Sequence, residues 1–271
     1  MIPIKYLNNR GAAVDLNANG VMASTTNMVA WKLDVNDTAG RITSLATDVV
    51  TSKVPAATYT RLARRRLYEI PAYDIADMKP WRLYIGDWYV RCYMTASSQE
   101  RWWAQDGGTK YDLEFTSDDP VWRRETEYSY TERHDGGQGL DYEHDYQFDY
   151  GYSSSAVNLV NENYLPADLI IRVYGPITNP RVTIAGNVYG ADVSLEQGDR
   201  LEIDTLEKTV TIVRLDGDRE NGFPDIYGEY SEGSGSYVFE KLPTGESGAT
   251  WDGSFDFDVV VVERRYEPRL V

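Results

Sequence analysis

Apolar residues alternate with polar ones along much of the C-terminal half of the chain. Leu169, Ile171 and Val173 are spaced two residues apart, and residues two apart lie on the same face of a β-strand. Each such segment can therefore bury one face of a sheet. The same period recurs in Leu201 with Ile203, in Val210 with Ile212, and in Phe255, Phe257, Val259 and Val261.

Turn-forming residues separate these segments. Glycine, asparagine and aspartate tolerate the backbone angles of tight turns, and they cluster at 185–187, 196–199, 216–218 and 251–253. Short strands joined by such turns are typical of antiparallel sandwiches and jelly rolls. The pattern therefore predicts an antiparallel β-sandwich or jelly roll in the C-terminal part of the chain.

The N-terminal half is less regular, but it contains strand-like segments at 81–85, 88–93 and 111–115. Gly86 and Asp87 predict a tight turn between the first two of these segments. Together with the C-terminal pattern, they predict a mainly β protein.

One segment has a helical period. Apolar residues spaced three and four apart lie on one side of a helix and can pack on a sheet. Pro71 follows the last of them and predicts the end of the helix, because proline inside a helix removes a backbone hydrogen bond. The stripe consists of Tyr59, Leu62, Ala63, Arg66, Leu67 and Ile70.

Residues 125–152 differ in composition from both halves, with eight acidic residues, one basic residue, six tyrosines and both histidines. Such a segment buries little aliphatic area, so we expect an extended arm or a long hairpin between two domains. We expect the boundary near residues 153–155. The predicted domains are then residues 1–152, which include the arm, and residues 156–271.

The overall charge of the chain disfavours nucleic acid as a partner. There are 271 residues, 43 acidic and 27 basic side chains, and a formal net charge of −16. A field of this sign repels phosphate backbones, so we expect no specific binding to nucleic acid.

The sequence also predicts no membrane insertion. The longest aliphatic run, Val259–Val262, is far shorter than the roughly 20 residues of a membrane-spanning helix. Residues 1–10 lack the apolar core of a secretory signal. We therefore expect a soluble protein that is made in the cytoplasm.

Candidate metal ligands match no known motif. His134 and His144 lie among acidic residues, but their spacing fits no metal site. Asp216, Asp218 and Glu220 resemble half of a calcium loop without its later glutamate, and they are typical of a solvated turn.

Candidate catalytic residues are equally unspecific. Paired carboxylates could indicate a glycosidase, but Asp256 and Asp258 simply share the polar face of a predicted strand. The sequence has no nucleophile elbow, phosphate-binding glycine loop or dinucleotide fingerprint. The single cysteine, Cys92, precludes an intramolecular disulfide and is predicted to be a buried apolar residue. We expect no enzyme activity, metal or cofactor.

Several stretches resemble the distal tail proteins of siphophages. In the C-terminal half they are IRVYGPITNP at 171–180, VTIAG at 182–186, GDRLEID at 198–204, TVTI at 209–212, FEKLPTG at 239–245, WDGSFDF at 251–257 and ERRYEP at 263–268. In the N-terminal half, LYIGDWYV at 83–90 and YDLEFTSDDPVW at 111–122 are similar to a strand pair of the same family. The matches span about residues 80–270.

This resemblance implies a fold and a function. The fold is an N-terminal β-sandwich or barrel domain with one helix that closes into a hexameric ring, followed by a C-terminal galectin-like antiparallel β-sandwich. The function is that of a structural virion protein at the tail tip, assembled in the host cytoplasm. The implied partners are five further copies of the chain, the tail tube protein, the tail-tip hub or fibre proteins, and the tape measure protein in the lumen.

A ring is built from contacts between two different patches on each subunit. Tyrosines provide large contact areas at a low cost in side-chain entropy, and acidic residues can line a channel that repels DNA. Adjacent tryptophans on a strand face opposite sides, and a subunit contact could cover both. The predicted contact or lumen residues are Trp102, Trp103, Tyr128, Tyr130, Glu132, Asp141, Tyr142, Asp145, Tyr146, Asp149 and Tyr150.

Two other functions compete with the ring. The C-terminal sandwich could be a carbohydrate-binding adhesin module that recognises a host cell-surface glycan, with Trp251 or Tyr227 as the aromatic platform. The chain could also be an enzyme, most plausibly a wall hydrolase. The family resemblance favours the structural ring over both.

Overall fold

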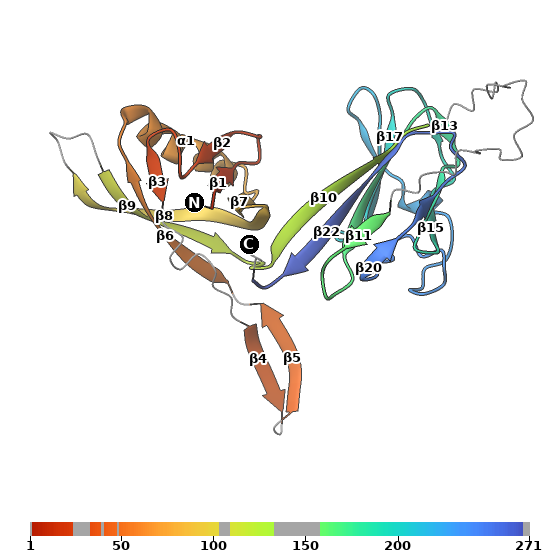
Figure 1. The fold of residues 1–271 in the computed structure, drawn as a ribbon, viewed down its shortest axis with the longest axis horizontal. Helices are drawn as coiled ribbons and strands as arrows, with labels where there is room; N and C mark the ends of the chain where they lie inside the picture. Colours follow the sequence, from red (N-terminus) through yellow and green to blue (C-terminus); the bar gives the residue numbers. More distant parts are fainter. Residues whose placement is uncertain are drawn as a thin grey trace, which may run out of the picture. The chain divides into compact units, whose positions relative to one another are not determined.

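The computed structural model describes residues 2–23, 33–38, 41–47, 49–102, 109–132 and 158–267. The chain forms two compact units (Figure 1). The first comprises Met1–Arg124 and Arg264–Val271, and the second comprises Glu125–Glu263. The predicted boundary at 153–155 lies outside the described residues, and this division falls between Arg124 and Glu125.

One antiparallel sheet forms the framework of the first unit. Its strand order is β2-β1-β7-β8-β9-β6-β3, and β4 and β5 pair only with each other. The strands are β1 (Ile4–Leu7), β2 (Ala13–Asp15), β3 (Val21–Ala23), β4 (Leu33–Thr38), β5 (Arg41–Thr47), β6 (Val50–Thr58), β7 (Trp81–Ile85), β8 (Trp88–Trp102) and β9 (Thr109–Ser117).

The three strands predicted in this half are confirmed. β7 and β8 pair in register from Trp81 with Cys92 to Ile85 with Trp88, and Gly86 in the turn between them has a positive φ of 60°. β8 is longer than predicted because its second half pairs with β9. Alternate residues of β9 are buried, including Tyr111.

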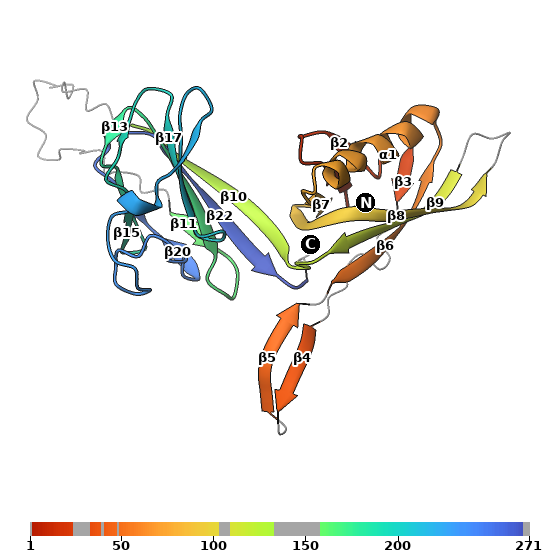
Figure 2. The same ribbon diagram turned by 180° about the vertical axis from the view of Figure 1, so that it is seen from behind.

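The predicted helix is α1 (Arg61–Ala76), the only α-helix among the described residues, and Figure 2 shows it beside the strands of its unit. Thr60 caps its first turn by accepting a hydrogen bond from the Ala63 backbone N–H. Ala63, Leu67 and Ile70 of the predicted stripe are buried.

Two details of the helix prediction are wrong. Tyr59 and Leu62 of the predicted stripe are 56% and 61% exposed, and Arg66 of the same stripe is exposed as well. The helix also continues past Pro71, which is buried, to Ala76. The lost backbone hydrogen bond costs stability, but the turn after Pro71 is held in place by a buried carboxylate, that of Asp74.

Asp74 joins the helix to the start of the chain. It is fully buried, and it accepts hydrogen bonds from the Tyr6 hydroxyl at 2.5 Å and from the Asn9 backbone N–H at 2.7 Å. Asn8, also fully buried, donates to the Ile70 carbonyl oxygen. These polar contacts compensate part of the cost of burying a carboxylate, and they fix α1 against β1.

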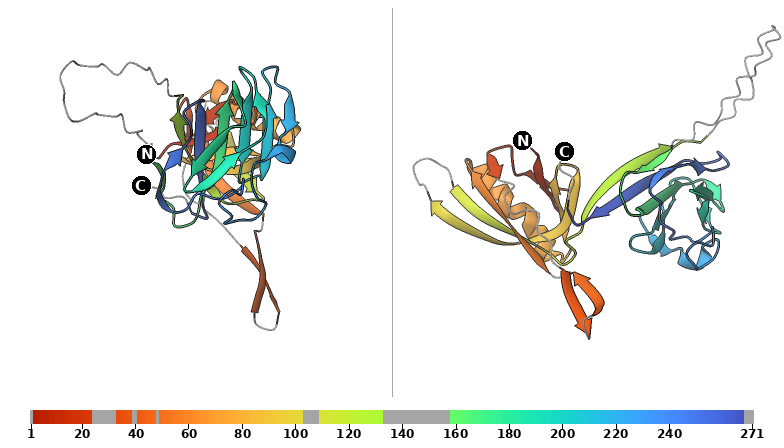
Figure 3. Two further views of the ribbon diagram at one scale, coloured as in Figure 1. Left: turned by 90° about the vertical axis from the view of Figure 1, so that its right-hand side faces the viewer. Right: turned by 60° about the horizontal axis from the view of Figure 1, so that its bottom comes forward.

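A two-layered antiparallel sandwich forms the second unit, as predicted, and its layers can be followed in Figure 3. The larger layer has the order β19-β18-β17-β12-β22-β10, and the other strands form the set β15-β14-β21 and the pairs β11-β20 and β13-β16. The elements are β10 (Trp122–Tyr130), β11 (Leu159–Asn161), β12 (Asp168–Tyr174), β13 (Ile177–Thr178), β14 (Arg181–Ile184), β15 (Asn187–Gly190), β16 (Ser194–Leu195), β17 (Arg200–Asp204), β18 (Thr209–Val213), β19 (Arg219–Asn221), the 3-10 helix η1 (Phe223–Asp225), β20 (Gly245–Ser247), β21 (Ala249–Thr250) and β22 (Phe257–Arg265).

The period-two pattern accounts for the core of this unit. Ile171 of β12 pairs with Val259 of β22 on one side and with Ile203 of β17 on the other, and all three are buried. The predicted turns are confirmed as well, because Gly186 and Gly217 have positive φ angles of 84° and 93°. The predictions of a mainly β chain and of a C-terminal sandwich are therefore confirmed.

Burial of Asp74 predicts a specific pH dependence. Burial raises the pKa of this carboxyl above its ordinary value of 3.8, so the folded chain keeps the proton to a higher pH than the unfolded chain. Its contribution to stability is therefore lost as the pH rises from about 4 towards the raised pKa. Relative to the wild type, Asp74→Asn should gain in unfolding free energy over this interval.

Denaturant titrations of both chains between pH 4 and 7 measure this difference. Asp112→Asn is the control, because it makes the same substitution at a carboxylate of β9 that is partly exposed and not buried. A constant difference between Asp74→Asn and the wild type across this range would contradict the assignment.

Candidate functional site

Most of the predicted contact residues lie outside the described residues. These are Trp103, Asp141, Tyr142, Asp145, Tyr146, Asp149 and Tyr150, together with the metal candidates His134 and His144. The structure describes the environment of Tyr128, Tyr130 and Glu132. Trp102 is the last residue of β8 and lies opposite Thr109 of β9.

Tyr130 belongs to the core of the second unit. Its ring stacks on Phe257 with the centroids 4.5 Å apart, and Trp251 meets it edge-on at 5.6 Å. Burial raises its pKa to about 12. A ring that is 4% exposed has no surface for a second subunit, so Tyr130 is withdrawn from the predicted contacts.

The neighbouring residues also bind to their own unit. Tyr128 packs against the same core, and its hydroxyl accepts a hydrogen bond from the Val160 backbone N–H at 3.2 Å. The Glu132 backbone N–H donates to Asp256 at 2.5 Å, and the Glu132 side chain is exposed. The start of the acid-rich segment thus continues β10 along the sandwich.

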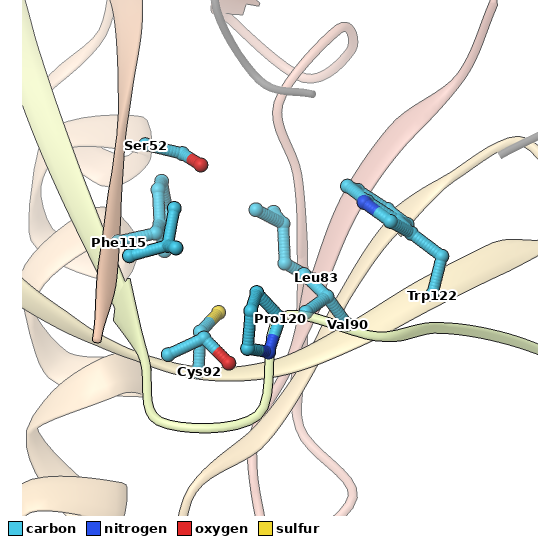
Figure 4. A pocket seen from close by; sticks show the side chains of 9 residues that line it. Ser52, Leu83, Val90, Cys92, Phe115, Pro120 and Trp122 are labelled. Carbon is cyan, nitrogen blue, oxygen red and sulfur yellow. The ribbon is translucent and has the colours of Figure 1, made fainter. Parts of the chain in front are cut away.

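A small cavity lies in the core of the first unit, between Ser52, Leu83, Cys92, Phe115 and Trp122 (Figure 4). Its volume of about 10 Å³ suffices for one water molecule and for no substrate. Cys92 is 1% exposed, and burial raises the pKa of its thiol. This environment agrees with the prediction of an apolar core residue.

The calcium-like residues form a turn. The Asp218 backbone N–H donates to the Asp216 carboxylate at 3.0 Å, as expected for an aspartate that stabilises a tight turn. Arg214 binds both Glu220 and Asp199, and these contacts lower the pKa of both carboxyls. In the described part of the chain, no three His, Cys, Asp or Glu side chains are placed to hold a metal ion.

An open groove of about 470 Å³ runs along β18, β19 and η1 in the second unit. Its lining combines the aromatic ring of Phe223 with polar side chains that include Thr211, Arg219 and Asn221. Phe223 is 37% exposed. The sequence interpretation missed this groove because its strand β19 consists of three exposed polar residues and has no apolar alternation.

The two platform residues proposed from sequence have other contacts. Trp251 donates a hydrogen bond from Nε1 to the Phe255 carbonyl oxygen and packs edge-on against Phe257. The guanidinium of Arg181 lies 4.1 Å above the ring centre of Tyr227. Both aromatic rings are therefore partly covered by their own unit, as is Phe223, whose ring stacks on Phe239 with the centroids 5.9 Å apart.

Charge is divided very unequally between the units. The first has 19 basic and 15 acidic side chains, a net charge of +4, and the second has 8 basic and 28 acidic, a net charge of −20. The acids of residues 125–152 belong to the second unit, and the arginines of residues 264–271 belong to the first. No helix in the described residues is long and apolar enough to cross a membrane.

Comparison with known proteins shows a shared fold. No protein-family model and no curated protein matches the chain. Two structures of the phage P2 baseplate in its activated conformation, with Ca and with Sr, contain chains that align with TM-scores of 0.57 and 0.55 at 11% and 12% identity. Each alignment covers 99% of this chain and 100% of the other.

A third match is the crystal structure of SPP1 Dit (gp 19.1), a paradigm of the hub adsorption apparatus in phages that infect Gram-positive bacteria. It covers 98% of this chain and 99% of the other, with a TM-score of 0.48 and 10% identity. The chain thus shares its fold over both units with chains of a phage baseplate, and this agrees with the predicted mainly β fold.

The burial of Cys92 predicts that its thiol is protected from chemical reagents in the folded chain. In the native chain, thiol labelling should be at least ~100-fold slower than in the unfolded chain, because reaction requires opening of the core. The rate of colour release from a disulfide reagent, with and without guanidinium, measures this ratio. Fast labelling of one thiol per native chain would show that the core around Cys92 opens readily.

Proposed function

We propose that this protein is a structural component of a phage tail tip, in which six copies form a ring at the distal end of the tail. The fold supports this role, because both units align over their whole length with chains of a phage baseplate. The ring joins the tail tube to the hub or fibre proteins. Its channel admits the tape measure protein and, during ejection, the DNA.

Ring assembly requires complementary surfaces on each copy, and the two units of the chain differ in charge in a way that can supply them. Ring closure needs two different patches on each subunit that fit one another. The two units differ in net charge by 24 elementary charges, +4 against −20, so each copy offers surfaces of opposite sign. The acidic excess would also repel a DNA backbone that passes close to it.

Among the sequence candidates, Glu132 and the acids of residues 141–149 remain candidates for the lumen or the rim of the ring. Trp102 and Trp103 remain candidates for a contact between subunits. In the virion these copies would meet the tube on one side and the hub or fibre proteins on the other. This function is architectural and needs no catalytic step.

The oligomeric state tests the ring directly. Mass photometry of the purified chain over a concentration series should show a discrete species of about 185 kDa, six copies of the 30.8 kDa chain. Negative-stain images of that species should show six-fold rings. A chain that stays monomeric at every concentration would contradict self-assembly into the ring.

A second candidate function is a carbohydrate-binding adhesin, and the groove beside β19 favours it. An exposed aromatic ring next to amide, hydroxyl and guanidinium groups can stack on the apolar face of a sugar and bind its hydroxyls. Phe223 and Asn221 provide such a pair here. This site differs from the platform inferred from sequence at Trp251 or Tyr227.

A glycan array with the full chain tests this second function. If the groove binds sugar, Phe223→Ala should abolish saturable binding. Tyr164→Ala is the matched control, because Tyr164 is a 65% exposed aromatic residue elsewhere on the same unit. Absence of binding by the wild type, or equal binding by both variants, would eliminate the groove as a sugar site.

A further inference from the structure

The exposed face of α1 combines basic and apolar side chains. Arg61, Leu62, Arg65 and Arg66 are all exposed in its first two turns, and Leu62 is 61% exposed. Arg66 lies one helical turn after Leu62. Tyr73, which is 44% exposed, lies two turns after Arg66 on the same side of the helix. We call this surface, made of Arg61, Leu62, Arg65, Arg66 and Tyr73, the α1 face.

Helix stability does not account for this charge pattern. The N-terminal end of a helix carries a partial positive charge, and it favours acidic side chains. The first turn of α1 has no acidic residue, whereas Arg61 and Arg64–Arg66 all lie in its first six residues. The helix dipole therefore disfavours Arg61 and Arg64 in the first turn and does not account for the cluster.

Only part of this charge is neutralised within the unit. Arg65 forms an ion pair with Glu69 at 2.6 Å, and Arg64 is partly buried and donates to the Thr109 hydroxyl. Arg61 and Arg66 form no ion pair with any of the described residues. Two cations therefore flank the exposed Leu62 without a partner in the described part of the chain.

The far end of the same face is basic as well. Arg10 lies over the Tyr73 ring, 4.4 Å from its centre, and binds Asp77. An aromatic ring covered by a guanidinium on one side and open to solvent on the other can contribute apolar contact area. The α1 face thus has the composition of an interface: apolar groups surrounded by arginine.

We propose that the α1 face binds the acidic second unit of another copy of this chain. The charge balance identifies this partner, because the second unit carries 28 acidic and 8 basic side chains. A ring needs a contact between unlike patches, and a basic helix with an acidic sandwich is such a pair. The inference rests on the proposed ring and adds a contact between neighbouring copies to those that the N-terminal domain makes in closing the ring.

Electrostatic contacts of this kind have a recognisable signature. They depend on ionic strength, because salt screens charges at a distance of about 10 Å at 0.1 M. Assembly of the wild type should therefore weaken as sodium chloride is raised. The apolar contribution of Leu62 and Tyr73 is insensitive to such screening, so assembly should persist at high protein concentration.

Charge reversal on the helix is the closing experiment. The double variant Arg61→Glu/Arg66→Glu changes the net charge by −4 and should raise the concentration for half-assembly by about tenfold or more at low salt. Lys79→Glu/Lys110→Glu is the control, because it makes the same change at two exposed positions of the same unit. The control should assemble within about twofold of the wild type.

The outcomes separate this proposal from the ring itself. If the wild type and both variants form rings equally well, the α1 face is not the contact and the ring stands. If the reversal and the control weaken assembly equally, the effect is one of net charge and the proposal fails. If the wild type forms no ring under any condition, both the ring and this contact are overturned.

Cross-linking locates the contact independently of the assembly constant. Arg66→Lys keeps the charge and introduces an amine that a carbodiimide couples to a carboxylate in direct contact. In a mixture of ¹⁴N- and ¹⁵N-labelled chains, mixed-isotope peptides should join position 66 to acids within residues 125–263. Links confined to one copy, or links to acids of the first unit, would overturn the proposal.

Discussion

The second unit depends on β22, a strand that is buried on both faces. A β-strand can be buried on both faces only where protein covers each of them. β22 lies between β12 and β10, and Val259, Val260, Val261 and Val262 are all buried. A slip of one residue in its pairing would exchange these two faces and move Asp258 towards the core. The run of valines thus fills both faces of the strand, and the polar side chain of Asp258 beside it disfavours a slipped register.

In the first unit, buried polar contacts fix the position of the helix α1. Asp74 holds the last turn of α1 against β1 through Tyr6 and the backbone of Asn9. This anchoring positions the whole helix, including the arginines on its exposed side. The fold therefore presents a fixed basic surface on a unit whose net charge is only +4.

The proposed function depends on the charged surfaces of the two units and not on an internal cavity. The internal cavity is too small for a substrate, and its cysteine is a packed side chain with a raised pKa. The unequal division of charge, in contrast, distinguishes one unit of the chain from the other. Head-to-tail contacts use such a difference directly, because a patch on each copy can meet an unlike patch on the next. The same difference favours contacts between unlike units over contacts between like units.

The sequence by itself determined β7, β8, β9, the alternating core strands of the second unit, their turns and the start of the helix, because these depend on the period of two or of 3.6 and on neighbouring residues. The strands β1–β6 were not predicted. Only the tertiary structure decided the role of Pro71 and Tyr130. The helix continues past Pro71 because Asp74 bonds Tyr6, 68 residues away in the chain. Tyr130 is a core residue because Phe257, on another strand, stacks on it. Such distant pairings leave no local pattern in the sequence, since the energy that selects them arises from packing.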